Sequence, residues 1–251
     1  MPPPPPRADW AYFFDIDGTL AELAATPTQA RVSPRLRERF AALQAATAGA
    51  VAIVSGRTLD DIDGLFGRAL PAAGLHGAER RDARGRVHRA NGVVRRRLHE
   101  ARAAIVGAIA LHPGLLLEDK GQALALHYRG SPRLASYAHR IMHVQRDRLG
   151  PRFAVQRGKY VVELLSAGVD KGVAIRAFLA EPPFRGRLPV FLGDDVTDEA
   201  GFAAVAKCGG YAIKVGGGAS GARFRLPSVR AVGAWLSTGV LDTRATPARR
   251  P

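Results

Sequence analysis

The alternation of short apolar runs with amphipathic segments is the feature that most constrains the fold of this chain. The runs at 10–16, 50–54 and 189–193 have the length and composition of buried strands. Apolar residues at helical spacing follow the first run, and we expect that helix to have Ser33 as its N-cap and Pro34 at its first position. Strands that alternate with helices form a parallel sheet covered by helices. We therefore predict an α/β fold with a Rossmann-like parallel sheet.

The middle of the chain departs from this alternation. Its expected elements are a polar hairpin at 80–92, basic helices at 94–111 and 132–148, strands at 115–119 and 122–129, and a hairpin around Gly158. This α+β order indicates an insertion, because alternation resumes afterwards with a helix at 170–180. We expect a discontinuous core, 1–79 plus 166–251, with an inserted α+β domain at 80–165. Residues 1–8 and 243–251 are expected to be disordered.

Positive charge is concentrated in the inserted segment. The chain has a formal net charge of +15, and residues 80–165 hold 18 Lys and Arg against 6 Asp and Glu. This concentration suggests that the insertion faces an anionic ligand. Arg outnumbers Lys 32 to 5, however, which a GC-rich genome explains equally well. Because aromatic RNA-binding motifs and zinc-finger spacings are absent, we expect no nucleic-acid partner.

Cysteine content and hydropathy bear on the compartment. The single cysteine, Cys208, excludes an internal disulfide. No stretch approaches the roughly 20 apolar residues that span a bilayer, and the start MPPPPPRADW lacks the apolar centre of a secretory signal. We therefore expect a cytoplasmic protein without a membrane partner, and we expect a monomer.

Polar side chains gather where the predicted strands end. They are Asp15 and Asp17 after the first strand, Ser55 and Arg57 after the second, Asp194 and Asp195 after 189–193 with Asp198 in the next turn, and Lys171 at a helix start. Ligands of open α/β sheets bind at this edge. Carboxylates that converge there repel one another unless a hard cation neutralises them, and oxygen ligands without a Cys or His cluster favour Mg²⁺.

The same edge carries groups suited to phosphate chemistry. A carboxylate that attacks phosphorus forms an aspartyl-phosphate, and Asp15 is the candidate nucleophile. The neighbouring Asp17 can protonate the leaving oxygen and then take a proton from the hydrolytic water. The candidate phosphate-binding residues are Ser55 and Lys171 through their side chains, and Gly18 and Thr19 at the turn that approaches the phosphate.

Four motifs carry a family resemblance. DIDGT (15–19), SGR (55–57), KG (171–172) and GDDVTDE (193–199) resemble, in order and spacing, the motifs of haloacid-dehalogenase-type phosphatases. The resemblance implies the roles given above and an inserted domain that caps the site. It also implies that Mg²⁺ is bound by the side chains of Asp15 and Asp194 and by the backbone carbonyl of Asp17. Asp195 and Asp198 are further metal ligands or neighbours of the ligands.

A finer resemblance is to trehalose-6-phosphate phosphatases. It lies in Pro27 after DGTL, in GLHGAE (74–79), in GLLLEDKGQALALHYR (114–129) and in GKYVVEL (158–164). It implies hydrolysis of trehalose 6-phosphate in trehalose biosynthesis, with a synthase on a separate chain. The residues that it implies for the sugar hydroxyls are Glu118, Lys120 and Glu163, and charged groups in a closed cleft discriminate sharply between sugars.

Several alternatives stay open at this point. Arg57 and His76 are candidates for substrate contact or a hinge, although GLHGAE can also be a simple turn. The charged residues of the insertion can equally form an exposed ladder of cross-strand ion pairs. We expect His127, Arg129, Arg157 and Lys159 to be solvated. Alternative functions are a phosphatase for sucrose 6-phosphate or a glycosyl-phosphoglycerate, a phosphosugar-binding regulator without catalysis, and a polyanion-binding protein.

Overall fold

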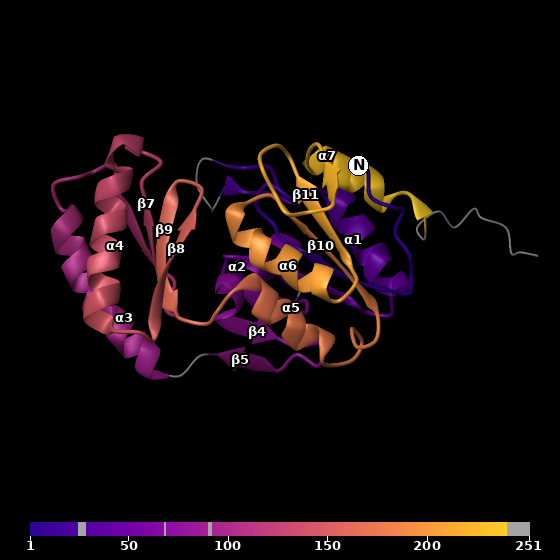
Figure 1. The fold of residues 1–251 in the computed structure, drawn as a ribbon, viewed down its shortest axis with the longest axis horizontal. Helices are drawn as coiled ribbons and strands as arrows, with labels where there is room; N and C mark the ends of the chain where they lie inside the picture. The colour runs from indigo at the N-terminus through magenta and orange to yellow at the C-terminus, as the bar shows by residue number, and fades with distance from the viewer. Residues whose placement is uncertain (25–28, 68, 90–91, 240–251) are drawn as a thin grey trace, which may run out of the picture.

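A large mixed sheet forms the first unit of the molecule (Figure 1). The computed structural model describes residues 1–24, 29–67, 69–89 and 92–239. The sheet has the strand order β12-β11-β10-β1-β2-β3-β4-β5. Its parallel strands are β1 (Trp10–Phe14), β2 (Val51–Val54), β3 (Ala72–Gly74), β10 (Leu188–Gly193), β11 (Tyr211–Val215) and β12 (Phe224–Leu226). The predicted α/β fold with a parallel sheet is confirmed.

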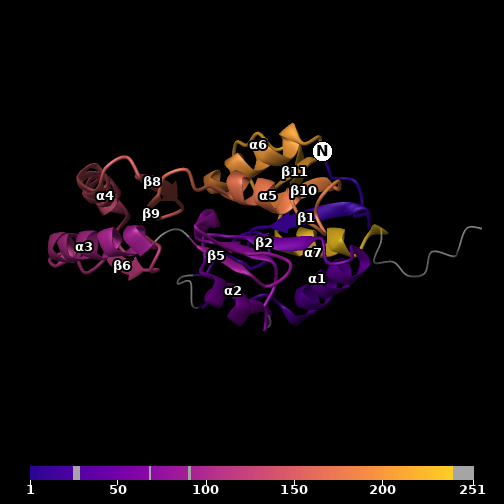
Figure 2. The same cartoon turned by 90° about the horizontal axis from the view of Figure 1, so that it is seen from below.

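Helices cover both faces of this sheet, as Figure 2 shows. One face carries α1 (Pro34–Ala46), α2 (Leu59–Phe66) and α7 (Val229–Leu236), and the other carries α5 (Lys171–Leu179) and α6 (Glu199–Lys207). Successive side chains of a strand point to opposite faces. Tyr12 and Phe14 therefore join the first core cluster and Phe13 the second. The side chain of Ser33 accepts from the backbone N–H of Leu36, which confirms the predicted N-cap.

A second, smaller unit spans residues 92–166. Its antiparallel sheet has the order β6-β7-β9-β8, and α3 and α4 pack on the face away from the first unit (Figure 1). Its elements are α3 (Gly92–Ile109), β6 (Leu116–Asp119), β7 (Ala123–His127), η3 (Pro132–Leu134), α4 (Ala135–Leu149), β8 (Phe153–Gly158) and β9 (Val161–Ser166). It has its own apolar core. No helix within the described ranges is long and apolar enough to cross a bilayer.

The start of this unit differs from the expected boundary at residue 80. Strands β4 (Glu79–Arg81) and β5 (Val87–Arg89) extend the large sheet in antiparallel fashion beyond β3. The hairpin is anchored there by Arg81, whose guanidinium lies 2.7 Å from a carboxylate oxygen of Asp63 on α2. Backbone hydrogen bonds attach an edge strand whatever its side chains are, so a polar hairpin does not reveal its sheet by composition.

The N-terminal segment also differs from the expectation of disorder at 1–8. The carbonyl of Met1 accepts from the N–H of Arg225, and the carbonyl of Pro4 accepts from the indole N–H of Trp235 at 2.8 Å. A proline run lacks N–H donors but keeps its carbonyl acceptors, so β12 and α7 can hold it through donors of their own. The expected disorder at 243–251 and the motif residue Pro27 lie outside the described residues.

Candidate active site

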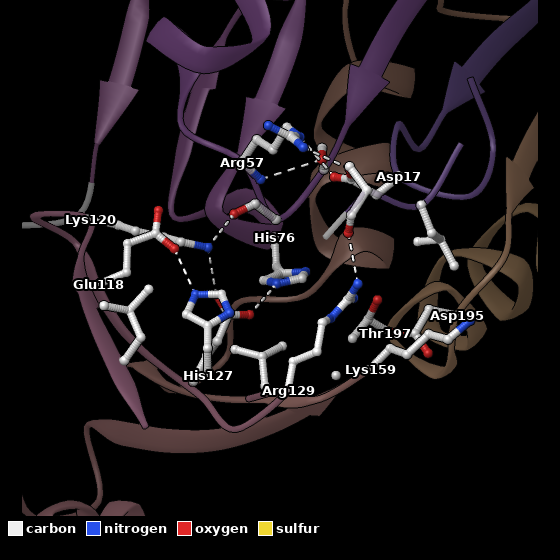
Figure 3. A pocket seen from close by; sticks show the side chains of 18 of the residues that line it. Asp17, Arg57, His76, Glu118, Lys120, His127, Arg129, Lys159, Asp195 and Thr197 are labelled. Atoms are coloured by element: carbon white, nitrogen blue, oxygen red, sulfur yellow. Dashed lines mark hydrogen bonds and ion pairs between the residues drawn. The ribbon is translucent and has the colours of Figure 1, made fainter. Parts of the chain in front are cut away.

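A cavity of about 610 Å³ lies between the carboxyl ends of the parallel strands and the sheet of the second unit (Figure 3). Eleven of the fourteen predicted site residues line it: Asp15, Asp17, Ser55, Arg57, His76, Glu118, Lys120, Glu163, Lys171, Asp194 and Asp195. The first unit supplies the aspartates and Lys171, and the second unit supplies Glu118, Lys120 and Glu163. The structure therefore brings the two predicted halves of the site to one cavity.

The remaining three predicted residues lie behind the lining. Asp198 is fully buried and contacts Lys171, as described below. Thr19 is also fully buried, and the backbone N–H of Gly18 donates to the carbonyl of Ala21 at 2.7 Å. The tight turn after β1 thus uses the backbone N–H groups of Gly18 and Thr19 internally, because the carbonyl of Ile16 accepts from Thr19 and from the two N–H groups that follow it. The expected phosphate contacts of Gly18 and Thr19 stay predictions, and the buried hydroxyl of Thr19 has no hydrogen-bond partner among the described residues.

Lys171 is the cation of the carboxylate cluster. Its ammonium nitrogen lies 2.8 Å from Oδ1 of Asp15 and 2.7 Å from Oδ1 of Asp198. The other oxygen of Asp198 accepts from the N–H of Asp195 at 2.9 Å, so both oxygens of Asp198 are engaged by the protein. The side chain of Asp195 caps the short helix η4 (Val196–Asp198) by accepting from Val196. In this structure Asp198 therefore forms an ion pair with Lys171, and Asp195 stabilises the adjoining turn.

The cluster holds more negative than positive charge. Carboxylate oxygens of Asp15, Asp194 and Asp198 lie within 4.8 Å of one another. Burial, with the neighbouring carboxylates Asp198 and Asp195, raises the pKa of Asp194 to about 7. Burial likewise raises the pKa of Asp15, although Lys171 opposes this. Three carboxylates and one ammonium leave a formal charge of −2, and the donors are hard oxygens, so these residues fit a divalent cation such as Mg²⁺.

Two glycines allow the carboxylates to pack this closely. A Cβ on Gly193 would lie 2.2 Å from Cγ of Asp198. Gly18 has φ +78°, and a Cβ there would lie 2.1 Å from an oxygen of Asp194. Real Cβ atoms do not approach other atoms so closely. The structural need for Gly193 was missed at the sequence level, where its position directly before two acids was the available signal.

Replacing Gly193 with alanine is expected to lower turnover by about 100-fold, because the new methyl group displaces Asp198 from Lys171 and misplaces the cluster by an ångström or more. The rate of the phosphate release that the four motifs imply, measured under substrate saturation, reports this effect. Gly217→Ala is the matched control, since a Cβ there meets no atom within 4 Å. Turnover of Gly193→Ala equal to that of the control variant would contradict the packing role.

Arg57 contacts Asp17 in this structure. Its Nε and Nη2 donate to the two carboxylate oxygens of Asp17, each at 2.7 Å (Figure 3). Arg57 is 8% exposed, and the pair keeps its guanidinium next to the candidate acid/base. The buried hydroxyl of Ser55 accepts from the backbone N–H of Arg57 at 3.3 Å. Arg57, which was predicted to contact the substrate, thus forms a two-bonded ion pair with Asp17 in this structure.

The charged residues of the second unit form a network. Glu163 is 5% exposed, and its two oxygens lie 2.9 Å from Nζ of Lys120 and 2.7 Å from Nε2 of His76. Glu118 accepts from Nε2 of His127 at 2.8 Å. The alternative of an exposed ion-pair ladder is therefore wrong for Glu163, which is buried and contacts the first unit.

Residues expected to be solvated also reach the cavity. His127, Arg129 and Lys159 line it, whereas Arg157 is exposed as expected. Arg129 donates from Nη1 to the carbonyl of Ala24 at 2.7 Å and so connects the two units. The available signal was position, because alternate residues near the end of β7 share one face with the pocket.

Solved structures of other proteins share this fold. The structure superimposes on a solved haloacid dehalogenase-like hydrolase from Bacteroides thetaiotaomicron with a TM-score of 0.66, covering 90% of this chain and 97% of that chain at 14% identity. A likeness at this identity concerns the fold alone. The chain thus has the Rossmann-like fold of the haloacid dehalogenase-like class.

The family is narrower than this class. The trehalose-phosphatase profile matches residues 13–227. The chain is 44% identical to the trehalose-6-phosphate phosphatase of Escherichia coli (strain K12), covering 91% of this chain and 86% of the relative. It is 47% identical to a probable trehalose-phosphate phosphatase of Sinorhizobium fredii (strain NBRC 101917 / NGR234), covering 83% and 78%. The chain belongs to the trehalose-phosphatase family of phosphoric monoester hydrolases, which confirms the resemblance found in the sequence.

Proposed function

We propose that this protein hydrolyses trehalose 6-phosphate to trehalose and phosphate with bound Mg²⁺. The observation that carries the proposal is the single cavity that joins Asp15, Ser55 and Lys171 to the charged network of the second unit. One end suits a phosphate and the other suits a sugar rich in hydroxyls. The names of the relatives and the family point to the same substrate. Residues 92–166 act as the cap that covers the site.

The chemistry uses two aspartates in turn. A carboxylate oxygen of Asp15 attacks phosphorus, the bond from phosphorus to the sugar oxygen breaks, and Asp17 gives that oxygen a proton. Water then attacks the aspartyl-phosphate, Asp17 takes the proton from the water, and the bond to Asp15 breaks to release phosphate. Both oxygens of Asp17 accept from Arg57 in this structure, so Asp17 has to turn from this pair to reach the leaving oxygen.

Charge neutralisation completes the site. Asp15, Asp194 and the backbone carbonyl of Asp17 would hold Mg²⁺, which supplies positive charge to the phosphate oxygens. Lys171 binds a phosphate oxygen through its ammonium, and Ser55 through its hydroxyl. Lys171 remains protonated, because Asp15 and Asp198 outweigh the effect of burial and raise the pKa of its ammonium.

Substrate and metal are tested together. We expect phosphate release from trehalose 6-phosphate to exceed that from sucrose 6-phosphate and glucose 6-phosphate by at least about 100-fold in kcat/KM, because unpaired buried polar groups penalise the wrong sugar. EDTA is expected to abolish release, and added Mg²⁺ to restore it. Preference for another ester would contradict the proposed substrate and keep the mechanism. Undiminished activity after EDTA treatment and metal-free dialysis would contradict the proposed requirement for Mg²⁺.

A further inference from the structure

Glu163 joins the two units of the molecule. It lies on β9 of the second unit, and His76, which contacts it at 2.7 Å, lies in the first unit 87 residues away. Lys120 contacts the other oxygen of Glu163 and also donates to the carbonyl of Gly56 at 3.0 Å. Figure 3 shows His76 and Lys120 on the same side of the cavity, apart from the Arg57–Asp17 pair. Two contacts from one buried network thus cross between the units.

The backbone of His76 is tied to the phosphate side of the site. Its N–H donates to the carbonyl of Ser55 at 2.9 Å, and the N–H of Leu75 donates to the carbonyl of Arg57 at 2.9 Å. Leu75 and His76, in the short helix η2 (Leu75–Gly77), have φ +50° and +58°. The imidazole lies over Gly56, where a Cβ would be 2.7 Å from Nε2. The backbone of this turn therefore supports the Ser55 loop, while its imidazole reaches the second unit.

The electrostatics of Glu163 require these contacts. Burial alone would raise the pKa of the Glu163 carboxyl, but Lys120 and His76 outweigh burial and hold it well below its ordinary value. The carboxylate is thus charged, and a buried charge is tolerated only when it is paired and hydrogen-bonded. Loss of the imidazole contact leaves one oxygen of Glu163 without its partner, so Glu163 and Lys120 are free to change position.

We propose that His76 is a positioning residue for sugar recognition, which holds Glu163, and through it Lys120, in the geometry that the sugar hydroxyls need. It acts from the first unit and contacts neither the phosphate nor the attacking oxygen. The proposal rests on the proposed function, since it concerns the sugar end of the same cavity. It concerns only the side chain of His76, because the backbone N–H that donates to Ser55 is kept in every substitution except proline.

The test compares two substitutions at His76 on two esters. Asparagine tolerates a left-handed backbone but is too short to reach Glu163, whereas glutamine extends far enough to donate to it. We expect His76→Asn to raise KM for trehalose 6-phosphate by about 10-fold to 100-fold, the usual effect of losing a hydrogen bond to a charged group. We expect kcat/KM for p-nitrophenyl phosphate, which has no sugar, to stay within about twofold. His76→Gln is expected to recover most of the lost affinity.

The controls separate this role from folding and from the proposed substrate. His88→Asn is matched, because His88 also contacts a carboxylate through Nε2, that of Asp82 at 3.1 Å, but lies outside the cavity. Unchanged KM in His76→Asn, or an equal loss on both esters, would overturn the proposal. If the wild type cleaves another phosphosugar faster, the substrate assignment fails and the same comparison on that sugar decides the role of His76.

A second pair of variants keeps the test informative if His76→Asn folds poorly, which its melting temperature reports. Glu163→Gln removes the charge that both Lys120 and His76 contact, so it is expected to raise KM as well. Because both residues act through one contact, adding His76→Asn to Glu163→Gln is expected to raise KM by less than the product of the single effects. Independent, multiplying effects would show that His76 does not act through Glu163.

Discussion

Replacing Asp15 with asparagine is expected to abolish phosphate release, with turnover falling by about four orders of magnitude or more, as for other nucleophiles that act as part of a unit. The amide cannot attack phosphorus as the carboxylate does. Asp15 is also buried, with 5% exposure, and its carboxylate lies 2.8 Å from the ammonium of Lys171. No other carboxylate can take over its position beside Lys171. Phosphate release from trehalose 6-phosphate, measured with Mg²⁺ in excess, reports the effect.

The same substitution is expected to leave the metal-free chain as stable as the wild type or more stable. The pKa of Asp15 is raised in the folded chain, so its charged form is disfavoured there and weakens folding at pH values above the ordinary pKa of the group. Asparagine removes that charge. Thermal melting in EDTA checks this, with Asp9→Asn as a control at an exposed aspartate that pairs with Arg7. Retained turnover in a folded Asp15→Asn would exclude Asp15 as the nucleophile.

Replacing Lys171 with methionine is expected to cost both activity and folding. Removing one member of a buried ion pair leaves uncompensated charge and costs about 3–5 kcal/mol. Lys171 is 2% exposed and contacts both Asp15 and Asp198, so both carboxylates lose their cation. The unfolding free energy from urea titration is expected to fall by about this amount, and phosphate release is expected to fall below detection.

The control for this loss is Lys207→Met, because Lys207 lies exposed near the end of α6. It changes the same charge outside the site, and we expect its unfolding free energy to stay within about 0.5 kcal/mol of the wild type. An unfolding free energy of Lys171→Met equal to that of the control would mean that Asp15 and Asp198 do not depend on Lys171.

The proposed phosphate end of the site was predictable because its residues follow buried strands. Asp15, Ser55 and Asp194 each come directly after a strand of the parallel sheet, and such ends share one edge. Lys171 opens α5 on the same edge. No distance has to be known for this inference, because the chain order of strands and polar residues is sufficient. The four motifs then narrowed the chemistry to one class of hydrolases.

The proposed sugar end of the site was predictable only through the family resemblance. Taken locally, the charges on β6 and β9 also suit two exposed strands that exchange ion pairs. What distinguishes the alternatives is the burial of Glu163 and its contact with His76, and both depend on how the second unit sits on the first. The role of Asp198 was open for the same reason, since a carboxylate after a strand can face a metal or a lysine.

Sequence alone determined the α/β order, the assembly of the core from two separate parts of the chain, and the cluster of carboxylates. The spacing of apolar residues and the polar residues that follow each strand are both local properties of the sequence. Only the tertiary structure decided that residues 79–89 join the large sheet, that the N-terminal prolines pack on α7, and which partner each buried charge takes. Arg57 selects Asp17 across 40 residues, and His76 selects Glu163 across 87. Such pairings depend on which residues come close in the folded chain. Edge strands attach through backbone groups that every residue carries. Neither the ion pairs nor the edge strands can therefore be predicted from local sequence.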